Sequence, residues 1–276
     1  MRRTPAALLA LTLAATGGLA ACTAAQRRTA STAAADALIS DQQEAQLGAQ
    51  VKQELEQKQK IKYVQDAEVV RYVNEVSTKV LRPANKARPG IPWKIHVIDD
   101  PKQVNAFATP GGYLYVYSGL ILAADNEAEL AGVMAHEAGH VVGRHSARQM
   151  VNAYGLEAVL GMALGKNAGG LGQVAAGLAG NGAMLANSRG METEADEYGA
   201  QFTSAANYDP RGLVSFFQKL QAQEGKTPGV LKWLSTHPTS ADRVAYLNQY
   251  LARNNLRGSE LGADRLQAIK RRLGGK

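Results

Sequence analysis

Three of the chain's five histidines fall in one stretch, MAHEAGHVVGRHSARQ, at residues 134–149. His136 and His140 are four residues apart, so on a helix their side chains lie about 40° apart around the axis and roughly 6 Å apart along it. Both imidazoles can therefore bind one zinc ion at about 2 Å. Glu137 is turned about 100° from His136, which leaves it outside the ligand set but within reach of a water on the metal. The H-E-x-x-H pattern thus predicts a zinc site with Glu137 as general base.

The same spacing also fits two surface histidines on an amphipathic helix. The apolar neighbours Val133, Met134, Val141 and Val142 favour a buried helix instead. Buried neutral histidines need a reason, and a metal supplies one.

A catalytic zinc site needs a third protein ligand, because three ligands and one water form the usual set. The remaining histidines are His96, His145 and His237. In the extended motif H-E-x-x-H-x-x-G-x-x-H the last histidine would fall at position 146, one residue beyond His145. On an unbroken helix His145 also lies about 140° from His140, which excludes it from the same face.

A carboxylate from a later helix is the alternative third ligand. The segment METEADEYG, at 191–199, offers Glu192, Glu194 and Asp196. Glu192 and Asp196 are four residues apart and share a helix face, whereas Glu194 lies about 200° from Glu192 and points away. One face can therefore supply a metal ligand and a carboxylate that orients a ligand histidine. Considered alone, the segment fits a solvated acidic face better; beside the H-E-x-x-H motif, the ligand interpretation is favoured.

The elements around the motif indicate an α+β fold. Asn126 and Glu129 form a capping box that begins the H-E-x-x-H helix. Ser40 caps a helix that runs through DQQEAQLGAQVKQELEQKQK, and a second helix over 66–83 ends at Pro83. WKIHVID (93–99) alternates as a strand does, and 104–121 reads as two strands around a Pro110–Gly111 turn. We expect a mainly helical zincin-type domain with a small antiparallel sheet beside the motif helix, and Tyr113, Tyr115 and Tyr117 on one face of it.

The segment 151–190 is rich in glycine and alanine, and residues 169–187 carry no charge. Its weak hydrophobicity favours a packed helical hairpin or a mobile lid over a membrane-spanning helix. Helical periodicity resumes near residue 188 and again over 213–223 and 240–254. The domain predicted on this basis spans 40–254, and a basic tail, either a final helix or frayed, follows at 255–276.

The N-terminus has the pattern of a bacterial lipoprotein signal. Two arginines, a short apolar run and small residues precede Cys22, the chain's one cysteine. We expect residues 1–21 to be a signal peptide, Cys22 to be lipidated, and 22–39 to be a flexible tether. Thr23, in place of an aspartate, favours the outer membrane. The net charge of +7 comes without a basic stripe interleaved with aromatic residues, so we expect no nucleic-acid partner.

The motifs HEAGHVVGRHSAR (136–148), ETEADEYG (192–199) and HPTSADR (237–243), with NAFATPGGYLYVYSGLI (105–121), resemble the HtpX-like and Oma-like metallopeptidases. Within that family the chain is most similar to short periplasmic lipoproteins of the LoiP and BepA type, over roughly residues 40–250. The resemblance implies one zinc per chain, with Glu192 as third ligand and Asp196 as its partner. This sequence is expected to depart from the family in two respects. HtpX-type members carry membrane-spanning helices, and BepA-type members carry a C-terminal helical-repeat domain, and we expect neither here.

The resemblance and the motif together predict a zinc endopeptidase of the Gram-negative periplasm that degrades misfolded or unassembled envelope proteins. The alternative is a zinc-containing, chaperone-like protein of outer-membrane protein assembly with little proteolysis. Extended substrate is expected to bind as an added strand near Asn105, Ala106 and Phe107. The sequence leaves the oligomeric state open.

The His-Pro segment adds two further candidate residues. Arg243 is expected to pair with Asp196. His237 either donates a hydrogen bond to an oxyanion or occupies the fourth metal position as a latch, and we favour the latch.

Overall fold

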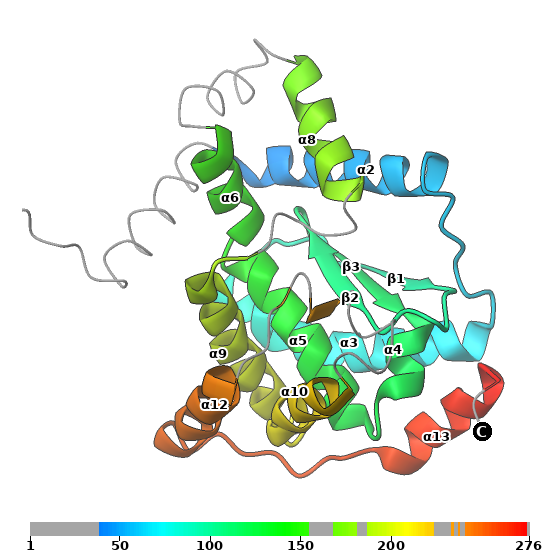
Figure 1. Cartoon of the computed structure of the whole chain (residues 1–276), viewed down its shortest axis with the longest axis vertical. Coiled ribbons are helices and arrows are strands. Elements are labelled where there is room, and N and C mark those ends of the chain that lie inside the picture. The colour runs from blue at the N-terminus through cyan, green and yellow to red at the C-terminus, as the bar shows by residue number, and fades with distance from the viewer. Residues whose placement is uncertain are drawn as a thin grey trace, which may run out of the picture.

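The computed structural model places the motif-bearing helix at the centre of the molecule (Figure 1). It describes residues 39–154, 168–180, 187–223, 233–234, 237 and 241–274. The predicted signal peptide, Cys22 and nearly all of the tether lie outside these ranges, as do two parts of the glycine-rich segment. Among the described residues, every helix is too short or too polar to span a membrane.

Helix α5 (Glu127–Val142) carries the H-E-x-x-H motif and is buried along its whole length. Most helices of a globular protein bury one face, so a helix buried all round must be enclosed by other elements. Its neighbours are α3 (Ala67–Ala87), α9 (Arg189–Ala205), α10 (Arg211–Gln223) and strand β2 (Ala106–Thr109). The side chain of Asn126 accepts a hydrogen bond from the Glu129 backbone N–H, so α5 begins where the sequence predicted.

Three strands form a small sheet in the order β1-β3-β2, with β1 at Lys94–Ile98 and β3 at Tyr113–Tyr117. Strands β2 and β3 form the predicted antiparallel hairpin, whose turn uses Gly111 and Gly112 at positive φ. The expectation of a wholly antiparallel sheet is wrong for β1, which pairs in parallel with β3. Strand β3 lies between β1 and β2. It runs antiparallel to β2, its hairpin partner, and in the same direction as β1.

The two faces of the sheet belong to two cores. Leu114 and Val116 of β3 face the larger core with α3 and α5, and the three tyrosines of β3 face the smaller one. The smaller core is closed by α2 (Asp41–Gln57), α6 (His145–Tyr154) and α8 (Ala168–Gly180), which lie across one end of the molecule in Figure 1. The α+β class predicted from the sequence is confirmed.

Two details of the helices differ from expectation. Pro83 does not end α3, which continues to Ala87; the turn after the proline is held by the Arg88 N–H, which donates to the Ala84 carbonyl. The residues after 254 contain α13 (Ala263–Arg272), whose Leu266 and Ile269 are buried against the larger core. The helices α4 (Ser118–Ala123) and α12 (Ala241–Arg253) complete the described elements.

Candidate metal centre

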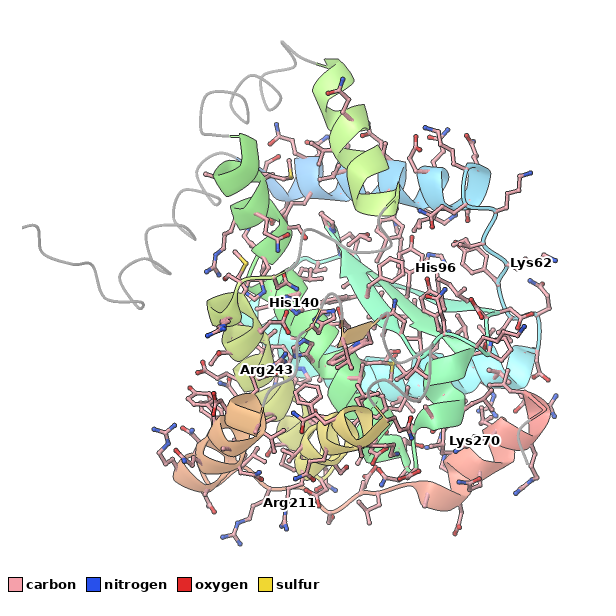
Figure 2. The ribbon with its side chains drawn as sticks, in the orientation of Figure 1. Lys62, His96, His140, Arg211, Arg243 and Lys270 are labelled. Atoms are coloured by element: carbon pink, nitrogen blue, oxygen red, sulfur yellow. The ribbon has the colours of Figure 1, made fainter. Side chains whose placement is uncertain are left out.

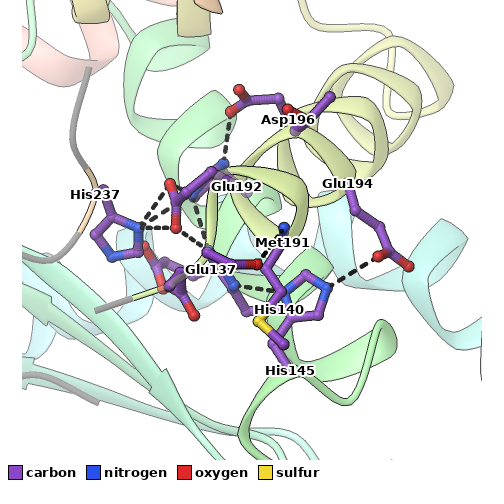
Figure 3. A network of polar contacts seen from close by, with 12 residues as sticks. Glu137, His140, His145, Met191, Glu192, Glu194, Asp196 and His237 are labelled. Atoms are coloured by element: carbon purple, nitrogen blue, oxygen red, sulfur yellow. Dashed lines mark hydrogen bonds and ion pairs between the residues drawn. The ribbon is translucent and has the colours of Figure 1, made fainter. Parts of the chain in front are cut away.

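Two turns of α5 and the first turn of α9 bring the three predicted metal ligands together. Figure 3 shows two of them, His140 and Glu192. The Nε2 atoms of His136 and His140 are 3.1 Å apart. The Glu192 carboxylate lies 3.6 Å from the His136 nitrogen and 3.4 Å from the His140 nitrogen. All three side chains are buried.

His237 lies at the fourth corner of this cluster. Its Nδ1 is 3.3 Å from Nε2 of His136 and 3.2 Å from both oxygens of Glu192. Its ring stacks on Trp233, with centroids 4.7 Å apart. The sequence had given His237 two candidate roles near the metal, and the structure places it against the ligands themselves.

The spacing of these donor atoms fits a tetrahedral metal ion. With bonds of about 2.0–2.1 Å, the corners of a tetrahedron are about 3.3 Å apart. Five of the six residue pairs have donor atoms 3.1 to 3.6 Å apart, close to that edge length, and one donor atom from each of the four residues lies within 4.8 Å of the others. Nitrogen and carboxylate oxygen are also the donors that zinc prefers. The donor set therefore fits zinc in number, type and spacing.

The close packing of α9 on α5 depends on two glycines. A Cβ on Gly139 would lie 2.9 Å from Cβ of Tyr198 and 3.0 Å from the Ala195 carbonyl oxygen. A Cβ on Gly199 would lie 3.2 Å from the His136 backbone. Without side chains at these positions the helices approach closely enough for Glu192 to reach both histidines.

Asp196 and Arg243 support the His136 ring at Nδ1, the nitrogen that does not face the other metal donors. Its Nδ1 lies 2.9 Å from Oδ1 of Asp196, and Arg243 forms two hydrogen bonds to that carboxylate, at 2.8 and 2.9 Å. Arg243 also contacts Glu192 at 2.9 Å. Burial lowers the pKa of His136, but the contacts with Asp196 and Glu192 outweigh it and raise that pKa to about 9. Arg243 thus pairs with Asp196, and Asp196 contacts a histidine of the cluster.

Glu137 projects from α5 beside the donor cluster. Its Oε1 is 3.4 Å from Nε2 of His237 and makes no hydrogen bond among the described residues. The Ala108 backbone of β2 hydrogen-bonds to the carboxylate. Burial raises the pKa of Glu137, an effect that the nearby histidines only partly offset. A buried carboxylate with a free oxygen and a raised pKa is equipped to take up a proton.

The predicted substrate segment lies next to Glu137. Asn105 and Ala106 are buried, and Phe107 stacks on Tyr115 with centroids 4.6 Å apart. Within the described sheet β2 pairs with β3 alone, so its other edge is not covered by a strand. The main chain along this edge is where an added strand is predicted to pair.

His145 contacts the cluster although helix geometry excluded it as a ligand, and Glu194, which was expected to point away, contacts His145. His145 Nδ1 lies 2.7 Å from Nδ1 of His140, and Glu194 lies 3.4 Å from the other ring nitrogen of His145. The angle assigned to His145 assumed an unbroken helix, whereas α5 ends at Gly143 and Arg144 has a positive φ of 53°. The one signal in the sequence was that glycine. The fifth histidine, His96, stacks among tyrosines on the sheet, away from the cluster (Figure 2).

A buried H-E-x-x-H helix with a glutamate from a following helix defines the class of zincin-type metallopeptidases. The model of peptidase family M48 matches residues 65–251, and the chain belongs to this family. The predicted resemblance is thereby confirmed. The zinc cofactor is confirmed as well, by this zinc-dependent family and by the buried donor cluster.

The chain is similar to a mitochondrial metalloendopeptidase and to bacterial proteases. The chain is 34% identical to the mitochondrial metalloendopeptidase OMA1 of Schizosaccharomyces pombe, over 65% of this chain and 52% of that protein. It is 32% identical to the β-barrel assembly-enhancing protease of Yersinia pestis and 30% identical to that of Escherichia coli K12. Each of these two alignments covers 66% of this chain and 39% of the relative. The chain thus matches about half or less of the length of these relatives.

Proposed function

We propose that the chain is a zinc-dependent endopeptidase of the Gram-negative periplasm that degrades misfolded or unassembled envelope proteins. The observation that carries the proposal is the carboxylate of Glu137, which is buried beside the metal-donor cluster and whose Oε1 makes no hydrogen bond within the described part of the chain. The bacterial relatives, named for β-barrel assembly, support an envelope setting. The lipoprotein-like N-terminus supports attachment to the outer membrane through Cys22.

The proposed chemistry assigns each side chain one task. His136, His140 and Glu192 hold the zinc, which when bound polarises the scissile carbonyl and lowers the pKa of a water. Glu137 accepts the proton of the attacking water and passes it to the leaving amine. Asp196, fixed by Arg243, holds the His136 ring in the orientation that directs Nε2 at the metal.

Substrate is proposed to bind as an extended strand along the edge of β2 that has no partner strand among the described residues. The hydrogen bond between Ala108 and Glu137 places that edge directly beside the proposed base. Main-chain pairing makes few demands on side chains, which suits unfolded polypeptides of varied sequence.

The Glu137→Gln variant tests this function. It keeps the shape of the side chain and removes the proton acceptor, so cleavage of an unfolded protein should fall by about 10²–10⁴-fold. Zinc content should stay at the wild-type level. Glu68→Gln, an exposed change on α3, is the matched control and should keep wild-type cleavage.

A deletion strain distinguishes the chaperone-like alternative. Under the proposed function, the Glu137→Gln variant does not restore growth under envelope stress. Full restoration by this variant would instead assign the biological role to binding without cleavage.

A further inference from the structure

His145 connects the proposed zinc ligand His140 to a second charged pair. Nδ1 of His140 and Nδ1 of His145 are 2.7 Å apart, and Nε2 of His145 lies 3.4 Å from Glu194. Arg148 donates a hydrogen bond of 2.8 Å to the same Glu194 oxygen. Figure 3 shows His140, His145 and Glu194 in one row, and the hydrogen bond from Arg148 to Glu194 extends it.

The backbone is shaped to admit the His145 ring. Helix α5 ends at Gly143, where an added Cβ would lie 2.5 Å from Nε2 of His145. Arg144 follows with a positive φ of 53°, and its guanidinium donates to the Ile39 carbonyl. Arg148 donates to the Gly143 carbonyl at 3.2 Å. The break in the helix, the missing side chain and the arginine contacts together turn His145 back toward His140.

The hydrogen bonds of this row have only one consistent direction. Nε2 of His140 faces the other metal donors, so its proton is on Nδ1 when the metal is bound. That N–H donates to Nδ1 of His145, which must then carry its own proton on Nε2. That nitrogen lies 3.4 Å from Glu194, which is an electrostatic contact and not a well-formed hydrogen bond, and the same carboxylate accepts a hydrogen bond from Arg148.

We propose that His145 is a positioning residue for His140, and that with Glu194 and Arg148 it fixes the tautomer and ring orientation of this zinc ligand. Asp196, held by Arg243, contacts the ring of His136 directly, whereas Glu194, held by Arg148, contacts His140 through His145. Each histidine ligand therefore has one carboxylate and one arginine behind it. Partners behind a ligand histidine commonly change metal affinity by about 10–100-fold. The inference rests on the zinc site of the proposed function.

The first test compares two changes at position 145 by competition of the purified protein with a zinc chelator. His145→Leu keeps the bulk and removes the acceptor, so zinc should bind about 10–100-fold more weakly. His145→Asn can present its amide oxygen near the position of Nδ1, so it should recover most of the affinity. His96→Leu makes the same change at the histidine outside the cluster and should bind zinc as the wild type does.

A spectroscopic reading separates positioning from packing. In the cobalt-substituted protein, the visible absorption bands report the geometry around the metal. They should shift in His145→Leu and return toward wild type in His145→Asn. Glu194→Leu should weaken zinc binding too, and the double variant should lose less than the two single losses combined, because both residues act through one row.

Three results would overturn the inference. The first is a folded His145→Leu protein with the zinc affinity and cobalt spectrum of His96→Leu. The second is a His145→Asn protein as weak as His145→Leu. If His145→Leu does not fold, a Glu194→Leu protein with the zinc affinity and cobalt spectrum of the wild type would be the third. Wild-type protein that binds no zinc would instead overturn the proposed function.

Discussion

At the scale of single residues, the centre divides its side chains between holding a metal and moving a proton. Burial shapes both tasks. It lowers the pKa of His140 and so favours the neutral imidazole that a metal needs. It raises the pKa of Glu137 and so favours proton uptake. The pKa of Glu192 stays well below its ordinary value despite burial, since the histidines around it favour the carboxylate.

The His237→Ala variant decides between the two roles of that residue. Nδ1 of His237 lies among the metal donors, which favours the latch. If the latched form makes up about 90% of the molecules, its removal should raise turnover of an unfolded substrate about tenfold. Initial rates of purified protein, with zinc content measured in parallel, give the answer. Turnover at or below the wild-type rate with zinc intact would rule out the latch.

The residues that the sequence located best are those whose placement is local. The spacing of His136, Glu137 and His140 sets their directions on any regular helix. The spacing of Glu192 and Asp196 likewise sets their directions on α9, although only the resemblance selected Glu192 as the ligand. The contact of His145 with His140 was not predicted because it depends on a break in the helix. One glycine does not predict the direction of the chain after such a break.

At the scale of elements, the contact of α5 with α9 builds the centre. Each helix supplies one part of the donor set, so the separation of the two helices determines whether the parts meet. Gly139 and Gly199 set that separation. The sequence predicted both helices, but not their closeness, because packing distance depends on which residues face each other across the interface.

The Gly139→Ala variant tests the role of this contact. The new methyl would clash with Tyr198 and the α9 backbone, so overpacking should cost about 1–3 kcal/mol of stability and weaken zinc binding. Thermal unfolding with and without a zinc chelator measures both effects. Gly177→Ala on α8, where an added Cβ meets nothing within 4 Å, is the matched control. Wild-type stability and zinc affinity in Gly139→Ala would contradict the proposed role of the glycine.

The sheet shows another limit of sequence reading. Alternation predicted the hairpin and the shared face of Tyr113, Tyr115 and Tyr117, because both follow from local geometry. The parallel pairing of β1 did not follow, since it depends on which strand of the hairpin lies beside β1. The same topology leaves β2 at an edge of the described sheet, with β3 as its one strand partner there.

At the scale of the whole molecule, two cores share one sheet, and the zinc-type cluster lies within the helices on one side of it. The described chain begins at Ile39, which is buried in the smaller core and whose carbonyl accepts a hydrogen bond from Arg144. Arg88 joins Asp41 and Glu44 of α2 to the end of α5 at the Val141 carbonyl. The N-terminal helix is thus fastened beside the metal centre.

The Cys22→Ala variant tests the proposed attachment of this molecule to a membrane. Without the thiol there is no site for lipid, so the protein should appear as soluble periplasmic protein or as uncleaved precursor. Fractionation of cell envelopes measures the distribution, and Ser31→Ala in the same segment serves as control. Unchanged sedimentation of Cys22→Ala with outer membranes would show that the anchor is not a lipid on this cysteine.

Anomalous diffraction at the zinc absorption edge, on crystals of the zinc-loaded protein, is the most direct test of the centre. One peak per chain is expected between α5 and α9, about 2.0–2.2 Å from Nε2 of His136, Nε2 of His140 and a carboxylate oxygen of Glu192. Glu192→Ala crystals should lose the peak. A zinc peak that does not touch Glu192, or full zinc occupancy in Glu192→Ala, would contradict the account.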